Sequence, residues 1–311
     1  MKIASQLDPV RNEVIRGMLP ELDIEFVEIP RGAPVTFDPT IEVFFAWPFR
    51  KAGQPDAPVP PGWPFGLKWV QLVSAGLDPY PDWLFEGPRV SNAAGTLAVP
   101  IAEFCLALIL AAAKRLPETW IESPEGWRLR KLAAVENATL GILGFGAIGE
   151  NLAKRALALG MKVHAARRSD APLIPGVARA GGIESLMEIS DHLVLAAPAT
   201  SRTRCLVNDK VLARAKPGLH LINVARGALV DNEALIRALD AGRLSLASLD
   251  VADPEPLPAG HPFYTHPRIR LSPHTSPMSD DADVRVARLF ADNLRRYLAG
   301  RELINAVAGR E

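Results

Sequence analysis

The chain has 311 residues, of which 48% are hydrophobic and 23% charged, as in an ordinary globular protein of one large or two medium domains. Lysine plus arginine and aspartate plus glutamate both number 35, so no excess charge directs the chain to nucleic acid or an acidic surface. The most apolar stretch, residues 99–113, contains Glu103 and is too short to span a bilayer, so we expect no membrane partner.

Cysteine usage and the N-terminus indicate the compartment. Cys105 and Cys205 are the two cysteines, and Cys105 lies in an apolar helical run, which argues against a disulfide framework. The N-terminus, MKIASQLDPV, lacks the apolar region of a signal peptide. We therefore expect a cytoplasmic protein, and we assign no metal site.

Residues 1 to about 95 alternate short apolar runs with connections rich in proline and glycine. This pattern is typical of a small sheet with loops. The runs are KIAS, IEFVEI, IEVFFAW and LKWVQLVSAG.

From Val99 onward the pattern predicts helices that alternate with strands. A long helix ends near Pro117, and TLGILGFGAIGENLAKRALALG then reads as strand, turn and helix. The later apolar runs lack polar alternation, which suits strands buried on both faces of a parallel sheet, so the fold class is doubly wound α/β. Asp231 is a plausible helix N-cap and Gly242 a plausible stop, and a last helix spans about 281–299.

Gly144, Gly146 and Gly149 form a G-x-G-x-x-G motif between a predicted strand and a predicted helix. Glycines there permit a tight turn, and the helix N-terminus offers N–H groups, here those of Ala147 and Ile148, to a pyrophosphate. A glycine-rich turn without a ligand is the alternative. The strand–turn–helix context favours a dinucleotide site.

The chain resembles the D-isomer-specific 2-hydroxyacid dehydrogenase family along nearly its whole length. Four segments carry the resemblance in the family's order and approximate spacing: GILGFGAIG, NVARGALVDNEAL, LASLDVADPEPLP and SPH. The resemblance implies two Rossmann-like domains, with the nucleotide domain inserted into a flavodoxin-like substrate domain. We expect the substrate domain at 1–98 and 283–311 and the nucleotide domain at 99–282.

Arg226, in NVARG, follows the predicted strand LHLIN. Ligands of open α/β sheets bind at the carboxyl ends of strands, where a planar fork of donors can hold the carboxylate and carbonyl of a 2-oxo acid. An arginine in this place could instead cap a helix or pair with a surface acid. Within the motif series, we predict that Arg226 binds the substrate.

His274, in SPH, is the candidate general acid, because hydride reduction of a ketone leaves an alkoxide that must be protonated. A carboxylate against its other ring nitrogen would fix the tautomer and favour the imidazolium. Asp253 and Glu255 compete for that role, and the family's pattern places its acid five residues beyond Asp250, at Glu255. The remaining histidines are interpreted as structural or surface residues: His164, His192, His220, His261 and His266.

The resemblance also implies further cofactor contacts, although the chain departs from the family after His274. There PHTSPMSDD replaces the usual small residues, so we expect Thr275 and Pro277 to reshape the nicotinamide edge of the pocket. The further expected cofactor contacts are Pro198, Thr203, Val224, Ala225, Asp250, His274 and Ser276.

Two segments of the expected substrate domain resemble the family's substrate contacts. In QLVSAGLD, the backbone amides of Ala75, Gly76 and Leu77 would hold the substrate carboxylate, although S-A-G alone is only a turn. In FFAWPFR, Trp47 resembles the tryptophan that closes the pocket in the glyoxylate/hydroxypyruvate reductase branch. A tryptophan after an apolar strand more often belongs to the core.

The stretch VHAARRS decides the expected cofactor. An NAD-binding fold usually ends its second strand with an Asp or Glu that accepts bonds from the ribose hydroxyls, and here that position falls on Arg167. A guanidinium suits a phosphate instead, so we predict a preference for NADP over NAD, with Arg168 and Ser169 assisting. Both arginines could also be solvated turn residues.

The sequence thus predicts an oxidoreductase that transfers a hydride between NAD(P)H and a small 2-oxo acid, with glyoxylate or hydroxypyruvate favoured, in the cleft between its domains. A formate- or phosphite-type dehydrogenase remains an alternative, although family members that oxidise formate carry Gln at the position of Glu255. A nucleotide-sensing corepressor-like protein is the alternative outside the enzymes. The helix from Val99 resembles the family's dimer-forming segment, so we expect a homodimer.

Overall fold

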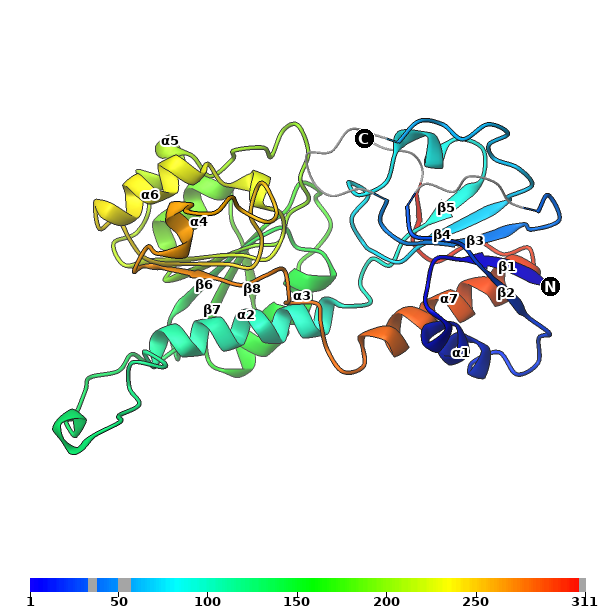
Figure 1. Ribbon diagram of the computed structural model, residues 1–311. Coiled ribbons are helices and arrows are strands. Elements are labelled where there is room, and N and C mark those ends of the chain that lie inside the picture. The colour runs from blue at the N-terminus through cyan, green and yellow to red at the C-terminus, as the bar shows by residue number, and fades with distance from the viewer. Residues whose placement is uncertain (33–37, 50–56, 308–311) are drawn as a thin grey trace. The chain divides into compact units, whose positions relative to one another are not determined.

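The computed structural model describes residues 1–32, 38–49 and 57–307. The chain divides into two compact units, which we call the split domain (Met1–Leu97 and Met278–Glu311) and the inserted domain (Ala98–Pro277) (Figure 1). The expected boundaries, after residue 98 and before residue 283, lie one and five residues from these limits.

The described residues of the split domain form one sheet in the order β13-β5-β4-β3-β1-β2. Its strands are parallel, except that β13 is antiparallel to β5. The 2-1-3-4-5 order of the parallel strands is the flavodoxin-like one. The strands are β1 (Lys2–Ser5), β2 (Glu25–Glu28), β3 (Val43–Ala46), β4 (Trp69–Leu72), β5 (Arg89–Ser91) and β13 (Ala306–Val307).

Helices α1 (Pro9–Gly17) and α7 (Ala282–Leu298) pack together on one face of this sheet, and η1 (Asp82–Phe85) is a short 3₁₀ turn (Figure 1). The core of that face includes a stack in which Phe290 of α7 lies 4.5 Å from Phe45 and 5.3 Å from Trp69, centroid to centroid. The expectation of a sheet with loops overlooked α1, a short helix whose start is fixed by Asp8, which accepts a bond from the Arg11 N–H.

The inserted domain contains an all-parallel sheet in the order β12-β11-β10-β9-β6-β7-β8. This is the doubly wound order, with the strand sequence reversing between β6 and β9. The strands are β6 (Thr139–Leu143), β7 (Lys162–Ala166), β8 (Val177–Arg179), β9 (His192–Leu195), β10 (Leu219–Asn223), β11 (Leu244–Leu249) and β12 (Ile269–Leu271).

Helices cover both faces of this sheet, as the uninterrupted apolar strands predicted. One core contains residues of α2 and α3, and the other contains residues of α4, α5 and α6. The helices are α2 (Ala98–Ala113), α3 (Ala147–Ala158), α4 (Ile183–Ile189), α5 (Asp209–Leu212) and α6 (Asn232–Asp240), with 3₁₀ turns η2 (Pro124–Gly126), η3 (Gly227–Leu229) and η4 (Pro262–Tyr264).

Helix α2 ends at Ala113, earlier than the expected end near Pro117. Arg115 adopts φ +52°, and the N–H of Leu116 donates to Ala111 O at 2.9 Å, which closes the helix with a left-handed turn. Residues 114–137, which we call the arm, then leave the body of the inserted domain and return to β6 (Figure 1).

Two local sequence signals at α6 are confirmed. The Asp231 carboxylate accepts a bond from the Ala234 N–H at 3.0 Å, and Gly242 takes φ +70° just after the helix. Across the described part of the chain, no helix is both long and apolar enough to cross a membrane.

Candidate active site

The turn between β6 and α3 has the shape of a phosphate-binding loop. Gly144 has φ +95°, and a Cβ there would lie 2.6 Å from the backbone of Ala196. A Cβ at Gly149 would lie 2.6 Å from the Gly144 carbonyl oxygen, whereas a Cβ at Gly146 would meet no atom within 4 Å. Packing therefore requires the outer two glycines, and the middle one leaves open space beside the start of the helix.

Backbone donors face this space. Gly146 caps α3 without a side-chain hydrogen bond, and among the described residues the N–H groups of Ala147 and Ile148 have no acceptor. Unsatisfied N–H groups at a helix start, together with the helix dipole, favour an anion. The loop therefore fits the pyrophosphate of a dinucleotide.

The turn after β7 carries the predicted ribose contacts. Arg167 is half-buried, while Arg168 and Ser169 are exposed. Arg179, the last residue of β8, holds this turn by donating to Ala171 O at 2.6 Å and to Ser169 O at 3.3 Å. Sequence reasoning missed Arg179 because it lies ten residues beyond the turn in a short strand without an apolar pattern.

The remaining cofactor candidates follow β9 and β10. The Thr203 hydroxyl donates to Pro198 O at 2.8 Å, so these two predicted residues belong to one turn. Val224 and Ala225 are both buried just beyond β10. All four lie after strands whose carboxyl ends meet at one edge of the parallel sheet.

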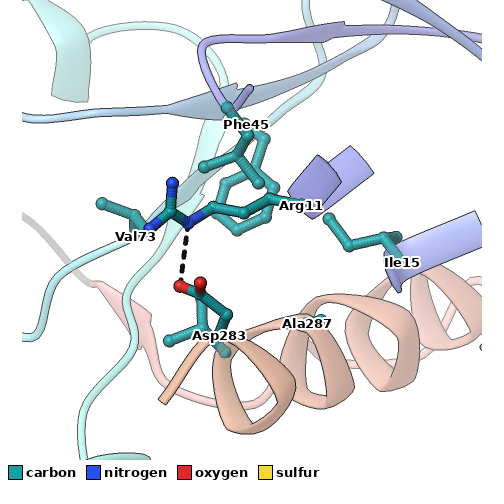
Figure 2. Close-up of a pocket in the computed structure, with 8 residues that line it drawn as sticks. Arg11, Ile15, Phe45, Val73, Asp283 and Ala287 are labelled. Carbon is teal, nitrogen blue, oxygen red and sulfur yellow. Dashed lines mark hydrogen bonds and ion pairs between the residues drawn. The ribbon is translucent and has the colours of Figure 1, made fainter. Parts of the chain in front are cut away.

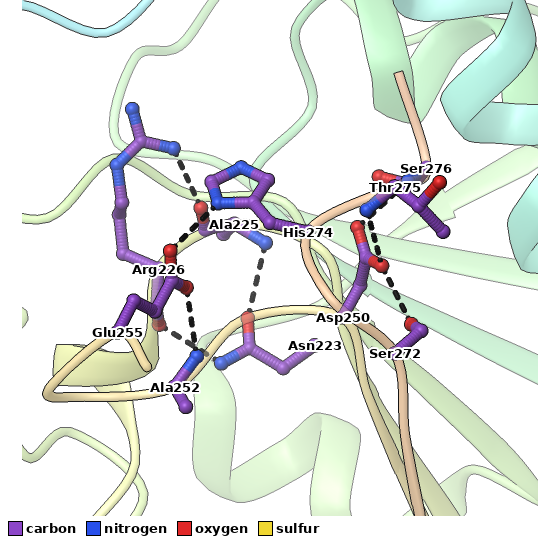
Figure 3. Close-up of polar contacts among 10 residues, drawn as sticks. All are labelled: Asn223, Ala225, Arg226, Asp250, Ala252, Glu255, Ser272, His274, Thr275 and Ser276. Carbon is purple, nitrogen blue, oxygen red and sulfur yellow. Dashed lines mark hydrogen bonds and ion pairs between the residues drawn. The ribbon is translucent and has the colours of Figure 1, made fainter. Parts of the chain in front are cut away.

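Arg226 is presented by a turn that the buried Asn223 organises (Figure 3). The Asn223 amide donates to Arg226 O at 2.9 Å and accepts from the Ala225 N–H at 3.1 Å, while the Arg226 guanidinium donates to Ala225 O at 2.7 Å. A Cβ at Gly227 would lie 2.0 Å from the Ala252 carbonyl carbon, so only glycine permits the close approach of these two loops. Sequence reasoning did not assign a role to Asn223, although it directly precedes VAR at a strand end.

Glu255 and His274 meet across these loops (Figure 3). One carboxylate oxygen of Glu255 lies 2.9 Å from His274 Nδ1, and the other accepts the Ala252 N–H at 2.9 Å. Burial by itself raises the pKa of the Glu255 carboxyl, but the hydrogen bonds from His274 and Ala252 and the charges of His274 and Arg226 outweigh it and hold that pKa below its ordinary value. Glu255 is therefore ionised at neutral pH and orients the ring.

Asp253, the other acid considered beside His274, faces a different partner. One of its carboxylate oxygens lies 3.4 Å from the guanidinium of Arg204, and its carbonyl oxygen accepts a bond from Asn232 at 3.2 Å. In this structure, Glu255 is the acid that contacts His274. Among the described residues, no group of three His, Cys, Asp or Glu side chains could hold a metal ion.

Asp250 organises the loop that carries His274 (Figure 3). This carboxylate is almost fully buried and accepts bonds from the Ser272 hydroxyl at 2.6 Å and from the N–H groups of Thr275 and Ser276, each at 2.9 Å. The His274 N–H donates to the Asp250 carbonyl oxygen at 2.8 Å, and His274 itself takes φ +52°. The segment that departs from the family pattern is thus anchored at its first two residues.

The split domain holds the predicted carboxylate-binding loop after β4. Its carbonyl oxygens are bonded within the domain: Asn92 donates to Ala75 O and Ser74 to Gly76 O, both at 2.9 Å. Within the described residues, the N–H groups of Ala75 and Gly76 have no acceptor. This arrangement leaves two donors for a substrate carboxylate.

Trp47 follows β3, the strand that pairs with β4. Its side chain is half-buried at the margin of the split-domain core, and its N–H donates to the buried side chain of Gln6 at 2.9 Å. Trp47 therefore stands at the same sheet edge as the loop around Gly76, with part of its ring exposed.

Comparison with known proteins gives a consistent result. The family model described as "D-isomer specific 2-hydroxyacid dehydrogenase, NAD binding domain" matches residues 106–276. A glyoxylate reductase of Aeropyrum pernix is 36% identical over 233 residues, covering 71% of this chain and 70% of the relative.

Two solved structures extend the likeness over both domains. A glyoxylate reductase from Paecilomyes thermophila has a TM-score of 0.82 at 26% identity and covers 99% of this chain and 98% of its own. A D-isomer specific 2-hydroxyacid dehydrogenase from Xanthobacter autotrophicus Py2, solved in complex with NADPH and MES, has a TM-score of 0.80 at 27% identity and covers 98% of this chain and 97% of its own. The chain therefore belongs to the D-isomer specific 2-hydroxyacid dehydrogenase family.

Proposed function

We propose that this enzyme reduces glyoxylate or hydroxypyruvate to the corresponding 2-hydroxy acid with a nicotinamide dinucleotide. The observation that carries the proposal is the 2.9 Å contact between His274 and Glu255, beside Arg226 at the carboxyl edge of the parallel sheet. The named relatives reported above support the choice of glyoxylate.

Each residue has a separate task in the proposed reaction. Arg226 holds the carboxylate and the carbonyl oxygen of the 2-oxo acid with its planar fork and polarises the C=O bond. His274 uses Nδ1 to contact Glu255, which leaves Nε2 to protonate the oxygen as the carbonyl carbon takes up a hydride. Glu255 stabilises the imidazolium that precedes this proton transfer.

The cofactor is NAD or NADP, which supplies the hydride when bound. The open space at Gly146 and the N–H groups of Ala147 and Ile148 would hold its pyrophosphate. We propose a preference for NADP, because the turn after β7 presents Arg167, Arg168 and Ser169 where an NAD-specific fold places a carboxylate. The relative solved with NADPH is consistent with this preference.

A formate-type oxidation is less well supported. That reaction produces carbon dioxide and leaves no alkoxide to protonate, so it has no use for an ionised carboxylate that orients a histidine. Glu255 is held in that state by two hydrogen bonds.

The deciding experiment measures the oxidation of NADPH and NADH at 340 nm with glyoxylate, hydroxypyruvate and pyruvate, and the reverse reaction with formate and phosphite. We expect turnover of glyoxylate and hydroxypyruvate. Turnover confined to formate or phosphite, or no turnover with any of these compounds, would contradict the proposal.

We further propose that the partner of the chain is a second copy of itself. The arm exposes apolar side chains, including Trp120 at 71% and Trp127 at 83% of their surface, and Leu129 is fully exposed. Ile121, Pro124 and Trp127 also line a shallow hollow there. A symmetric pair of arms would bury surface that the inserted domain leaves in water.

Sedimentation velocity tests the dimer. We expect a dimer for the parent protein at micromolar concentration and a shift to monomer for the double variant Trp127→Ser, Leu129→Ser. A parent that sediments as a monomer would exclude the proposal.

We also propose a cytoplasmic location. Cys105 is a buried free thiol and Cys205 an exposed one. An exposed free thiol is best preserved in a reducing compartment. Fractionation of producing cells tests this location, and recovery outside the cytoplasm would contradict it.

A further inference from the structure

The carboxyl ends of β2, β1, β3 and β4 meet at one edge of the split-domain sheet, because these neighbouring strands are parallel. The segments that follow them carry Arg31, Gln6, Trp47 and the loop around Gly76, in that spatial order. Of the described residues, this edge therefore carries both segments with predicted substrate contacts in the split domain, together with Arg31, which has no assigned role.

A buried glutamine ties this arginine to Trp47. Gln6 is 2% exposed, and its amide nitrogen donates to Pro30 O at 2.8 Å and to Gly32 O at 2.6 Å, on either side of Arg31. Its amide oxygen accepts the Trp47 N–H at 2.9 Å. The backbone positions of Arg31 and Trp47 are thus set by one side chain that water does not reach.

Arg31 lies over the indole of Trp47, with its Cζ 4.1 Å from the ring centroid. A guanidinium over an aromatic ring makes a cation–π contact and still has N–H groups to donate to acceptors. Among the described residues, Arg31 makes no ion pair and donates no side-chain hydrogen bond, and its charge acts on Asp8 only from a distance.

The neighbouring arginine, Arg11, is already neutralised. Figure 2 shows its guanidinium directed at Asp283, with Nε 2.8 Å from a carboxylate oxygen, and it also pairs with Asp8. Its Cζ lies farther from Trp47, at 5.7 Å from the ring centroid. Within the described part of the chain, Arg31 is therefore the cation at Trp47 that remains available to a ligand.

We propose that Arg31 binds a second anionic group of the substrate, so that the enzyme accepts 2-oxo acids with a carboxylate or phosphate beyond the ketone. The inference rests on the proposed function, because it takes the free N–H groups of Ala75 and Gly76 and the ring of Trp47 as parts of the substrate site. Carboxylates and phosphates share the planar, charge-assisted recognition that a guanidinium edge offers. Glyoxylate has no heavy atom beyond its carbonyl group and so has nothing to place against Arg31.

The experiment compares kcat/KM for four substrates in the parent, Arg31→Gln and Arg31→Lys. Oxaloacetate has a carboxylate tail, 3-phosphohydroxypyruvate a phosphate tail, 2-oxobutyrate an uncharged tail, and glyoxylate no tail. For Arg31→Gln we expect the ratio of either dianion to 2-oxobutyrate to fall about tenfold, mainly through KM, corresponding to about 1.4 kcal/mol. Arg31→Lys should retain part of the ratio, because the charge stays but the fork is lost.

Arg16→Gln is the matched control. Arg16 is also an arginine of the split domain that lies over an aromatic ring, 5.7 Å from the centroid of Phe26, but it sits on α1 away from this edge. The Arg16→Gln variant should have kcat/KM values near those of the parent for all four substrates. A fall limited to one dianion would identify carboxylate or phosphate as the group bound.

Two results would overturn the proposal: a parent that prefers 2-oxobutyrate to both dianions, or an Arg31→Gln variant with unchanged ratios. If Arg31→Gln does not fold, the Arg31→Lys ratios decide in the same way. Failure of the proposed function itself would look different, since then the parent would not reduce glyoxylate.

Discussion

His220 lies within the parallel sheet of the inserted domain and His274 lies just beyond its carboxyl edge, so the two rings stand in opposite surroundings. His274 follows β12 at the carboxyl edge, where its side chain is 41% exposed and contacts Glu255. His220 lies within β10 and is 2% exposed, with Nδ1 3.1 Å from Nδ1 of His192 and Nε2 2.9 Å from the Ser248 hydroxyl.

The chemical consequences of these surroundings differ. Burial, assisted by the nearby His192, lowers the pKa of His220 to about 3, so this ring stays neutral and serves as a hydrogen-bonding part of the core. At the edge, the Glu255 carboxylate contacts the ring of His274, and solvent reaches that side chain. Position relative to the sheet, not residue type, therefore separates a candidate acid from a structural histidine.

Removing each ring in turn tests this comparison most strongly. His274→Gln should lower kcat/KM for glyoxylate by about 10²–10⁴, the usual contribution of one general acid, while NADPH binding, followed by fluorescence titration, stays nearly intact. His220→Gln should retain the activity of the folded enzyme and lose stability instead. Comparable activity losses in both variants would contradict the distinction between His274 as the candidate acid and His220 as a structural residue.

Lowering the pH should destabilise the protein, because the folded state keeps the buried ring of His220 neutral. The folded-state pKa of His220 lies below the unfolded value of 6.5, so only the unfolded chain takes up this proton as the pH falls from 6.5 towards 3. The contribution of His220 to stability is complete above pH 6.5 and declines below it by about 1.4 kcal/mol per pH unit.

Urea unfolding at pH 7 and pH 5 measures this effect. The stability advantage of the parent over His220→Gln should shrink by about 2 kcal/mol between the two pH values. An advantage that does not change with pH would mean that His220 takes up its proton equally in the folded and the unfolded protein.

Arg226→Lys tests whether the reaction requires the planar guanidinium of Arg226 or only a positive charge at this position. Lysine keeps the charge but cannot make two parallel bonds, so kcat/KM for glyoxylate should fall about tenfold or more, since a charge-assisted bond contributes about 1.5–3 kcal/mol. Arg237→Lys, at a surface ion pair with Asp209, is the control and should have little effect. An Arg226→Lys variant as active as the parent would exclude Arg226 as the substrate clamp.

The turn after β7 is largely exposed, and there we expect the smallest effect. The parent should use NADPH more efficiently than NADH, and Arg167→Asp should lower that preference about tenfold, because one charge-assisted contact to the phosphate is lost and a repulsive charge is added. The ratio of the two kcat/KM values measures it. A parent that prefers NADH would contradict the NADP assignment.

Local signals in the sequence were sufficient for much of the fold. The spacing of Gly144, Gly146 and Gly149 predicted the loop before α3, and Asp231 predicted the start of α6. The signals were weakest where elements are short and not apolar, as in α1 and β8. The family resemblance, and no local signal, predicted that the motifs around Arg226, Glu255 and His274 form one site.

The pattern of buried strands, the helix caps and the order of the motifs could therefore be predicted from the sequence, because they depend on neighbours a few residues away. The structure places Glu255, the acid that the family resemblance implied, at His274. Three other contacts had no signal in the sequence: Asp250 beneath the loop of Ser272 and Ser276, Arg179 at the turn of Ser169, and Gln6 between Arg31 and Trp47. A hydrogen bond forms only when the donor–acceptor distance is within a few tenths of an ångström of its usual length. The loops that carry these donors and acceptors are positioned by separate strands, so no local pattern in the sequence predicts their distances.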